Sequence, residues 1–137
     1  MTSVLAGKRV LVIEDTVENM RLFRAVLKLE GVQILEAERA QKGIEMACRE
    51  QPDLILMDIQ MPDMDGLTAT RILRADAKTR DIPIIAVSAS VMARDRHKTL
   101  EAGCDGHIAK PIDPSTFGAE IAVFLKPRAD RSDSQNA

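Results

Sequence analysis

The segment Asp53-Leu-Ile-Leu-Met-Asp-Ile-Gln-Met-Pro-Asp-Met-Asp-Gly66 decides how the chain is expected to fold. It opens with the continuous apolar run Leu54–Met57, and such runs are typical of parallel strands covered by helices on both faces. An acidic residue, Asp58, follows this run directly, and a helical pattern over Leu67–Ala75 comes after the loop. A strand, a loop and a helix in this order predict one β-α unit of a parallel α/β sheet.

The same alternation extends from this segment toward both ends of the chain. Four further short apolar runs are predicted to be strands: Arg9–Ile13, Val32–Leu35, Ile82–Val87 and a weaker Gly106–Ala109. Helical spacing of apolar residues predicts helices over about Val17–Glu30, over Ala40–Cys48, over Val91–Ala102 and after Asp113-Pro114, where the aspartate caps and the proline takes the first helical position. Gly31 and Gly103 are expected to end two of these helices. Five successive β-α units predict a doubly wound α/β fold with helices on both faces of the sheet.

Composition narrows the class of protein. A length of 137 residues with 45% apolar and 29% charged residues predicts one globular domain with a well-covered core. A formal net charge of −2, three Phe and no Tyr or Trp argue against a nucleic-acid partner. The sequence has no hydrophobic signal region and no apolar run of membrane-spanning length, so a cytoplasmic location without a membrane partner is expected. Cys48 and Cys104 are expected to be reduced and mostly buried.

The domain is expected to occupy residues 7–126. Residues 127–137 are polar and are predicted to form a disordered tail. The chain shows no internal repeat.

Polar side chains gather at the predicted strand ends. Glu14 and Asp15 follow the first strand, Asp58 the third, Ser88 the fourth and Lys110 the fifth. Functional sites of parallel α/β sheets lie outside the carboxyl ends of the strands. Taken singly, each residue is better explained as a helix cap, a turn residue or a surface lysine. Because all five fall at strand ends, a shared site is the better interpretation.

The charges of this set suggest a chemistry. Two carboxylates about 4 Å apart repel by roughly 4 kcal/mol at an effective dielectric constant near 20, so a divalent cation or a lysine must compensate them. Clustered carboxylates with few other ligands suit Mg²⁺, which often shares phosphate oxygens. Metal and Lys110 together would form a positive pocket for a phosphoryl group. A carboxylate can act as the nucleophile in phosphoryl transfer, and Asp58, central in the predicted sheet, is the natural candidate.

At this point the motifs resemble those of the response-regulator receiver domains of two-component signalling. Four segments carry the resemblance, which extends from about Lys8 to Leu125: Leu11–Asp15, Asp53–Gly66, Ile84–Ala89 and Ala109–Ile112. Met-Pro-x-Met-Asp-Gly after an acidic strand end, joined to a distant Lys-Pro, is highly specific. The resemblance implies a flavodoxin-like (βα)5 fold whose five parallel strands follow the order 2-1-3-4-5.

The resemblance also implies roles for the site residues. Asp58 would be the phosphoacceptor, and Lys110 and Ser88 would contact the phosphoryl group as further catalytic residues. The Lys110–Pro111 peptide would be cis. Gln60 and Ser90 occupy positions that tune the hydrolysis of the acyl phosphate in this family. The Mg²⁺ cofactor would be held by four groups, the first of them acting through a water molecule: Glu14, Asp15, Asp58 and the backbone carbonyl of Gln60.

A conformational switch is implied as well. Ser88 is expected to turn toward the bound phosphoryl group, and the output surface would comprise the fourth helix, the fifth strand and the fifth helix. His107 stands where the family usually has Tyr or Phe, which makes it a second switch candidate. A pH-sensitive role for His107 and a half-exposed histidine tuned to one partner both stay open. The expected partners are a histidine kinase or histidine phosphotransfer protein, and a downstream protein target.

Several other functions do not fit the same residues. The segment Asp63–Gly66 is not a calcium loop, because the first and twelfth ligand positions would be Met61 and Ile72. It is not the nucleophile motif of haloacid-dehalogenase-type phosphatases, which should directly follow a hydrophobic strand, and an ATP-binding loop is missing from the sequence. The chain is thus expected to be a signalling protein that assists only its own phosphorylation and dephosphorylation. A receiver-like interaction module that is not phosphorylated remains the rival, and an independent protein, a phosphorelay shuttle and a receiver of a hybrid kinase all stay open.

Overall fold

The computed structural model describes residues 4–89 and 93–125. Its sheet is parallel throughout, in the order β2-β1-β3-β4-β5. The strands are β1 (Arg9–Ile13), β2 (Gln33–Ala37), β3 (Leu54–Asp58), β4 (Ile84–Ser88) and β5 (Gly106–Ala109). The helices are α1 (Val17–Leu29), α2 (Ala40–Glu50), α3 (Gly66–Ala75), α4 (Ala93–Ala102) and α5 (Phe117–Ala122). The predicted fold class and strand order are therefore confirmed.

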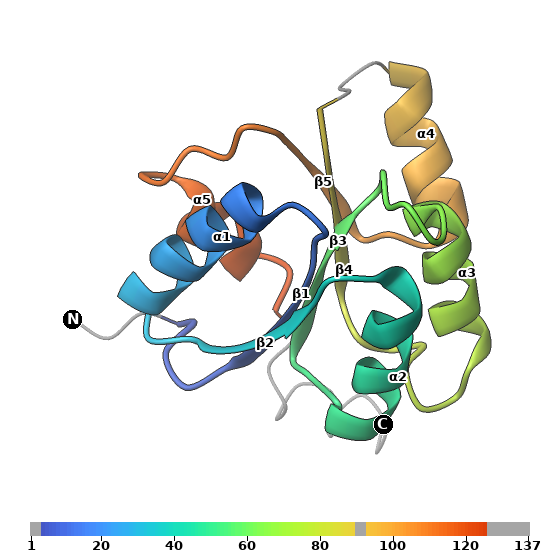
Figure 1. Ribbon diagram of the computed structural model, residues 1–137, viewed down its shortest axis with the longest axis horizontal. Helices are drawn as coiled ribbons and strands as arrows, with labels where there is room; N and C mark the ends of the chain where they lie inside the picture. Colours follow the sequence, from blue (N-terminus) through green and yellow to red (C-terminus); the bar gives the residue numbers. More distant parts are fainter. Residues whose placement is uncertain (1–3, 90–92, 126–137) are drawn as a thin grey trace, which may run out of the picture.

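The sheet separates two layers of helices. Helices α1 and α5 lie on one side of it, and α2, α3 and α4 lie on the other (Figure 1). Alternate residues of the central strands face the two layers: Val10 and Val12 pack toward α1 and α5, whereas Leu11 and Ile13 pack toward α2. Strands β3 and β4 are buried along their whole length, as their continuous apolar sequences predict. Within the described ranges, no helix is long and apolar enough to cross a membrane.

Some boundaries differ from those predicted. The last helix begins at Phe117 and not at Pro114, because the Asp113 carboxylate accepts hydrogen bonds from Ser115 N (3.0 Å) and Ser115 Oγ (2.7 Å) and closes a turn first. Strand β4 starts two residues later than expected, since Ile82 belongs to the preceding turn. Strand β2 lies at Gln33–Ala37, so it starts one residue later than expected and continues two residues further, where it pairs with the end of β1. The predicted helix start at Val91 and the predicted tail, 127–137, lie outside the described residues.

The structure also describes the two glycines predicted to end helices and the two cysteines. Gly31 and Gly103 have φ angles of +76° and +113°, the left-handed conformation expected of glycines that end helices. Cys48 and Cys104 are free thiols, as predicted, although only Cys104 is buried and Cys48 is partly exposed.

The side chain of Arg74, on α3, forms hydrogen bonds to residues beside α4, β4 and β5. These contacts lie at the amino ends of the strands, opposite the edge where Asp58 lies. Its Nε donates to the carbonyl oxygen of Gly103 at 2.8 Å, after the end of α4. Its Nη1 donates to the carbonyl oxygen of Ile82 at 2.6 Å, just before β4. Its Nη2 donates to Asp105 Oδ2 at 2.7 Å, just before β5. One guanidinium at the end of α3 thereby fixes the entries to two strands.

Arg74→Lys is expected to lower the free energy of unfolding by about 1–3 kcal/mol, because an ammonium cannot donate in three fixed directions and leaves carbonyls unpaired. Urea unfolding at 25 °C measures the difference. Arg71→Lys, on the exposed side of the same helix, is the matched control and should change stability by less than about 0.5 kcal/mol. Similar losses in both variants would contradict the role given to Arg74.

Candidate functional site

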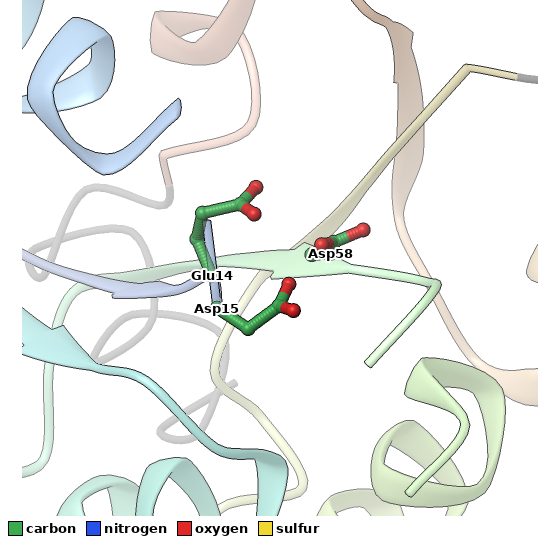
Figure 2. A group of neighbouring side chains, drawn as sticks. All are labelled: Glu14, Asp15 and Asp58. Atoms are coloured by element: carbon green, nitrogen blue, oxygen red, sulfur yellow. The ribbon is translucent and has the colours of Figure 1, made fainter. Parts of the chain in front are cut away.

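Three carboxylates meet at the carboxyl edge of the sheet. Glu14 and Asp15 follow β1, and Asp58 is the last residue of the neighbouring strand β3. Figure 2 shows the three side chains directed toward a common space. One ligand oxygen from each lies within 4.8 Å of the other two. Glu14 and Asp58 are almost fully buried, at 1% and 4% exposure, and Asp15 is partly exposed.

The ammonium of Lys110 lies against two of these carboxylates. Its Nζ is 3.0 Å from Glu14 Oε1 and 3.3 Å from Asp58 Oδ1. Lys110 follows β5, and its backbone N–H donates to the carbonyl oxygen of Ser88 at 2.8 Å, which fixes the start of the loop. The Lys110–Pro111 peptide is cis, as expected. The structure thus brings together four of the five residues predicted at strand ends, and the fifth, Ser88, adjoins them through the backbone.

Burial raises the pKa of both acids, but the net shift is upward for Asp58 and downward for Glu14. Burial, together with the negative charge of Glu14, raises the pKa of Asp58 to about 6 although Lys110 opposes the shift. Burial also disfavours the charged form of Glu14, but the nearby Lys110 ammonium and the hydrogen bond from the Thr16 backbone N–H outweigh it and lower the pKa of Glu14. Glu14 therefore keeps its charge more readily than Asp58 does.

The residues present fit a divalent cation. Three carboxylates face a single lysine, so the site carries an excess of negative charge in a small volume. Glu14 Oε1 is buried and accepts no hydrogen bond in regular geometry from any described residue, although the Lys110 ammonium lies close to it. Carboxylate oxygens are the ligands that Mg²⁺ prefers in proteins. The exposed residue Gln60 lies beside the cluster, and its backbone N–H donates to Asp58 Oδ1 at 3.1 Å.

Gly66 lets the third helix begin directly beneath Asp58. The backbone N–H of Gly66 donates to the carbonyl oxygen of Ile59 at 2.9 Å. A Cβ at this position would lie 2.6 Å from the Asp58 carbonyl oxygen and 2.7 Å from Ile59 Cα, a clash with backbone that no rotamer change relieves. Asp65 caps the same helix by accepting from the Leu67 N–H at 3.0 Å. The close approach of α3 to the site therefore requires Gly66, and Asp65 stabilises the start of the helix.

Asp63 caps helix α2, which lies earlier in the sequence, and the sequence patterns did not predict this role. Its two carboxylate oxygens accept from the backbone N–H groups of Ala40 and Gln41, each at 3.0 Å, at the start of α2. The residue before that helix, Arg39, makes no side-chain capping bond. A helix without Ser, Thr, Asp or Asn at its start was the available signal that a cap must come from elsewhere.

Ser88 and His107 contact each other. Ser88 Oγ lies 2.9 Å from His107 Nε2, and His107 is partly buried on the neighbouring strand β5. The two candidate switch residues are thus adjacent in space, although 19 positions separate them in the sequence. Ser90, the other position of interest on this loop, lies outside the described residues.

Comparison with known proteins agrees with this geometry. Residues 10–122 match the family described as response regulator receiver domain. The chain is 37% identical over 118 residues to the polar-differentiation response regulator DivK of Brucella anthropi, covering 86% of this chain and 96% of that protein. A solved receiver domain of the sensor histidine kinase PA1611 from Pseudomonas aeruginosa, with magnesium coordinated in its active site cleft, superposes with a TM-score of 0.80 at 32% identity, covering 87% of this chain and 98% of that one. The chemotaxis protein CheY4 of Vibrio cholerae has the same fold, with a TM-score of 0.83 at 21% identity, covering 88% and 100%. The chain therefore belongs to the response regulator receiver domain family of two-component signalling.

Proposed function

We propose that this chain is a phosphoacceptor switch. It takes a phosphoryl group from a histidine kinase or a histidine phosphotransfer protein onto Asp58, with Mg²⁺ as cofactor, and changes conformation for a protein partner. The proposal rests chiefly on one observation: the Lys110 ammonium lies within 3.3 Å of Asp58 Oδ1 while two further carboxylates share the same space. The partly buried lysine can neutralise an anionic group at the buried aspartate, and the surplus of negative charge suits the divalent cation that would assist the transfer.

The transfer needs Asp58 as a carboxylate. One of its oxygens forms a bond to phosphorus while the bond from phosphorus to the donor histidine nitrogen breaks, and the electron pair of that bond returns to the imidazole. Lys110 is placed to shift from the carboxylate to the phosphoryl oxygens and to neutralise their charge. Glu14, Asp15, Asp58 and the Gln60 carbonyl would hold the cation, which when bound supplies further positive charge at the same oxygens.

The wider setting is part of the same proposal. The DivK relative is named a response regulator, and the PA1611 neighbour is a receiver of a sensor histidine kinase with magnesium in its cleft, which supports the donor class and the metal. The switch residues would be Ser88 and His107, and the output face would be α4, β5 and α5. The functional domain would span residues 7–126, and the protein would act in the cytoplasm.

Wild-type protein incubated with Mg²⁺ and a small-molecule phosphodonor is expected to gain the mass of one phosphoryl group, because Asp58 is the buried nucleophile next to Lys110. Intact-mass spectrometry measures the gain. Asp58→Asn should gain nothing, whereas Asp81→Asn, at an exposed site away from the cluster, should behave as wild type. Absence of uptake by the wild type would favour the interaction module that is not phosphorylated.

Without Mg²⁺, Asp58→Asn is expected to be more stable than wild type by about 1–3 kcal/mol at pH 8. The pKa of Asp58 rises from 3.8 to about 6 on folding, so the folded state binds the proton more tightly and wild-type stability falls as the pH rises between those values. The advantage of the variant should therefore shrink at pH 5. Urea unfolding at both pH values measures it.

Saturating Mg²⁺ should remove most of this difference at pH 8, because a cation bound by the ionised carboxylate stabilises the folded wild type only. Asp81→Asn serves again as the control and should follow the wild type at each pH and Mg²⁺ concentration. A variant at Asp58 that is less stable than wild type at pH 8 would contradict the electrostatic picture of the site.

A further inference from the structure

The loop between β3 and α3 is bound to the start of helix α2. Asp63, in this loop, accepts hydrogen bonds from the backbone N–H groups of Ala40 and Gln41, each at 3.0 Å. Gln60 stands three positions before Asp63, a distance that an extended chain covers in at most about 10 Å. The backbone N–H of Gln60 donates to Asp58 Oδ1 at 3.1 Å. The short segment that carries the Gln60 carbonyl is therefore held at one end by β3 and at the other by α2.

Helix α2 connects this loop with the strand that supplies the other two carboxylates. The first turn of α2 packs directly on β1 at Gly43, where a Cβ would lie 2.3 Å from Ile13 Cδ1. Ile13 is the last residue of β1, and Glu14 and Asp15 follow it. Contacts thus continue from the end of β1 through the start of α2 to Asp63 and its loop. The two halves of the carboxylate site are joined by α2 as well as by the pairing of β1 with β3.

We infer that Asp63 is a positioning residue for the metal site: by binding the loop to α2, it holds the Gln60 carbonyl in place for the cation. This inference rests on the proposed function, in which that carbonyl is one of the groups that hold Mg²⁺. Met61 also anchors the loop, because its side chain is buried. A methionine packs adaptably, however, whereas two directed hydrogen bonds fix the orientation of the loop. Coupling of this kind is reciprocal, so a bound cation should in turn strengthen the cap on α2.

The role of Asp63 in the metal site can be separated from its role as a helix cap. Arg39, the residue before α2, has the extended backbone of an N-cap (φ −135°, ψ 149°) but makes no side-chain capping bond. A serine at this position could cap α2 from within its own segment. The double variant Arg39→Ser, Asp63→Ala therefore restores a cap to α2 and leaves the loop without its attachment to the helix.

Mg²⁺ affinity, measured by calorimetry, tests the inference. Asp63→Ala should weaken Mg²⁺ binding by about tenfold, the lower end of what loss of a group that orients a metal ligand costs. The double variant Arg39→Ser, Asp63→Ala should recover stability to urea toward that of wild type but keep the weakened affinity. Asp63→Asn removes the charge and keeps one acceptor oxygen, so its affinity should lie closer to wild type than to Asp63→Ala.

Each contrary outcome has its own meaning. Wild-type affinity in Asp63→Ala overturns the inference, and so does a double variant whose affinity recovers together with its stability, because capping of α2 would then explain the loss. Equal losses in Asp63→Asn and Asp63→Ala would assign the effect to charge alone and overturn it too. These results leave the proposed function intact, whereas a wild type that binds no Mg²⁺ overturns the proposed metal site and the inference with it.

Hydrogen exchange in the unaltered protein gives a measure that does not depend on the folding of any variant. Mg²⁺ should slow the exchange of the backbone amide hydrogens of Ala40 and Gln41, because the bound cation holds the loop that caps them. Exchange rates at these two amides that stay the same when Mg²⁺ binds would overturn the coupling.

Discussion

The ammonium of Lys110 between Glu14 and Asp58 is the interaction on which the site depends. Two buried carboxylates with oxygens within 4.8 Å of each other repel by several kcal/mol at the dielectric constants that describe protein interiors, so they could not both stay ionised without a nearby cation. The lysine compensates only part of the charge, because Asp15 adds a third carboxylate. The cluster is therefore held together and yet keeps a net negative charge, which suits a divalent cation.

This balance is produced by the order of the strands. Glu14 and Asp58 are neighbours because they lie at the ends of β1 and β3, two strands that pair directly. Lys110 follows β5, and its long side chain reaches the acids from there. The acids thus lie at the buried centre of the sheet, whereas the lysine comes from an edge strand.

Much of this was accessible from the sequence, for physical reasons. Continuous apolar runs such as Leu54–Met57 leave few alternatives to a parallel strand covered on both sides, and residues just after such strands must meet at one edge. Short-range turn chemistry was harder: the Asp113 carboxylate closes a turn before α5 instead of capping the helix directly. Contacts that depend on rotamers across strands, such as Ser88 with His107, leave no periodic trace in the sequence. The same is true of Arg74 and Asp63, whose partners lie in other elements.

The two hydrogen bonds between Asp63 and the first residues of α2 have a consequence for the design of chimaeric receiver domains. Because the loop after Asp58 supplies the cap of a helix that starts 23 positions earlier in the sequence, those two segments cannot be exchanged independently. A loop from another receiver domain that lacks this aspartate would leave the backbone N–H groups of Ala40 and Gln41 without their acceptor. The start of α2 would then be less stable. Grafting the loop together with a helix start that has its own cap would keep both elements folded.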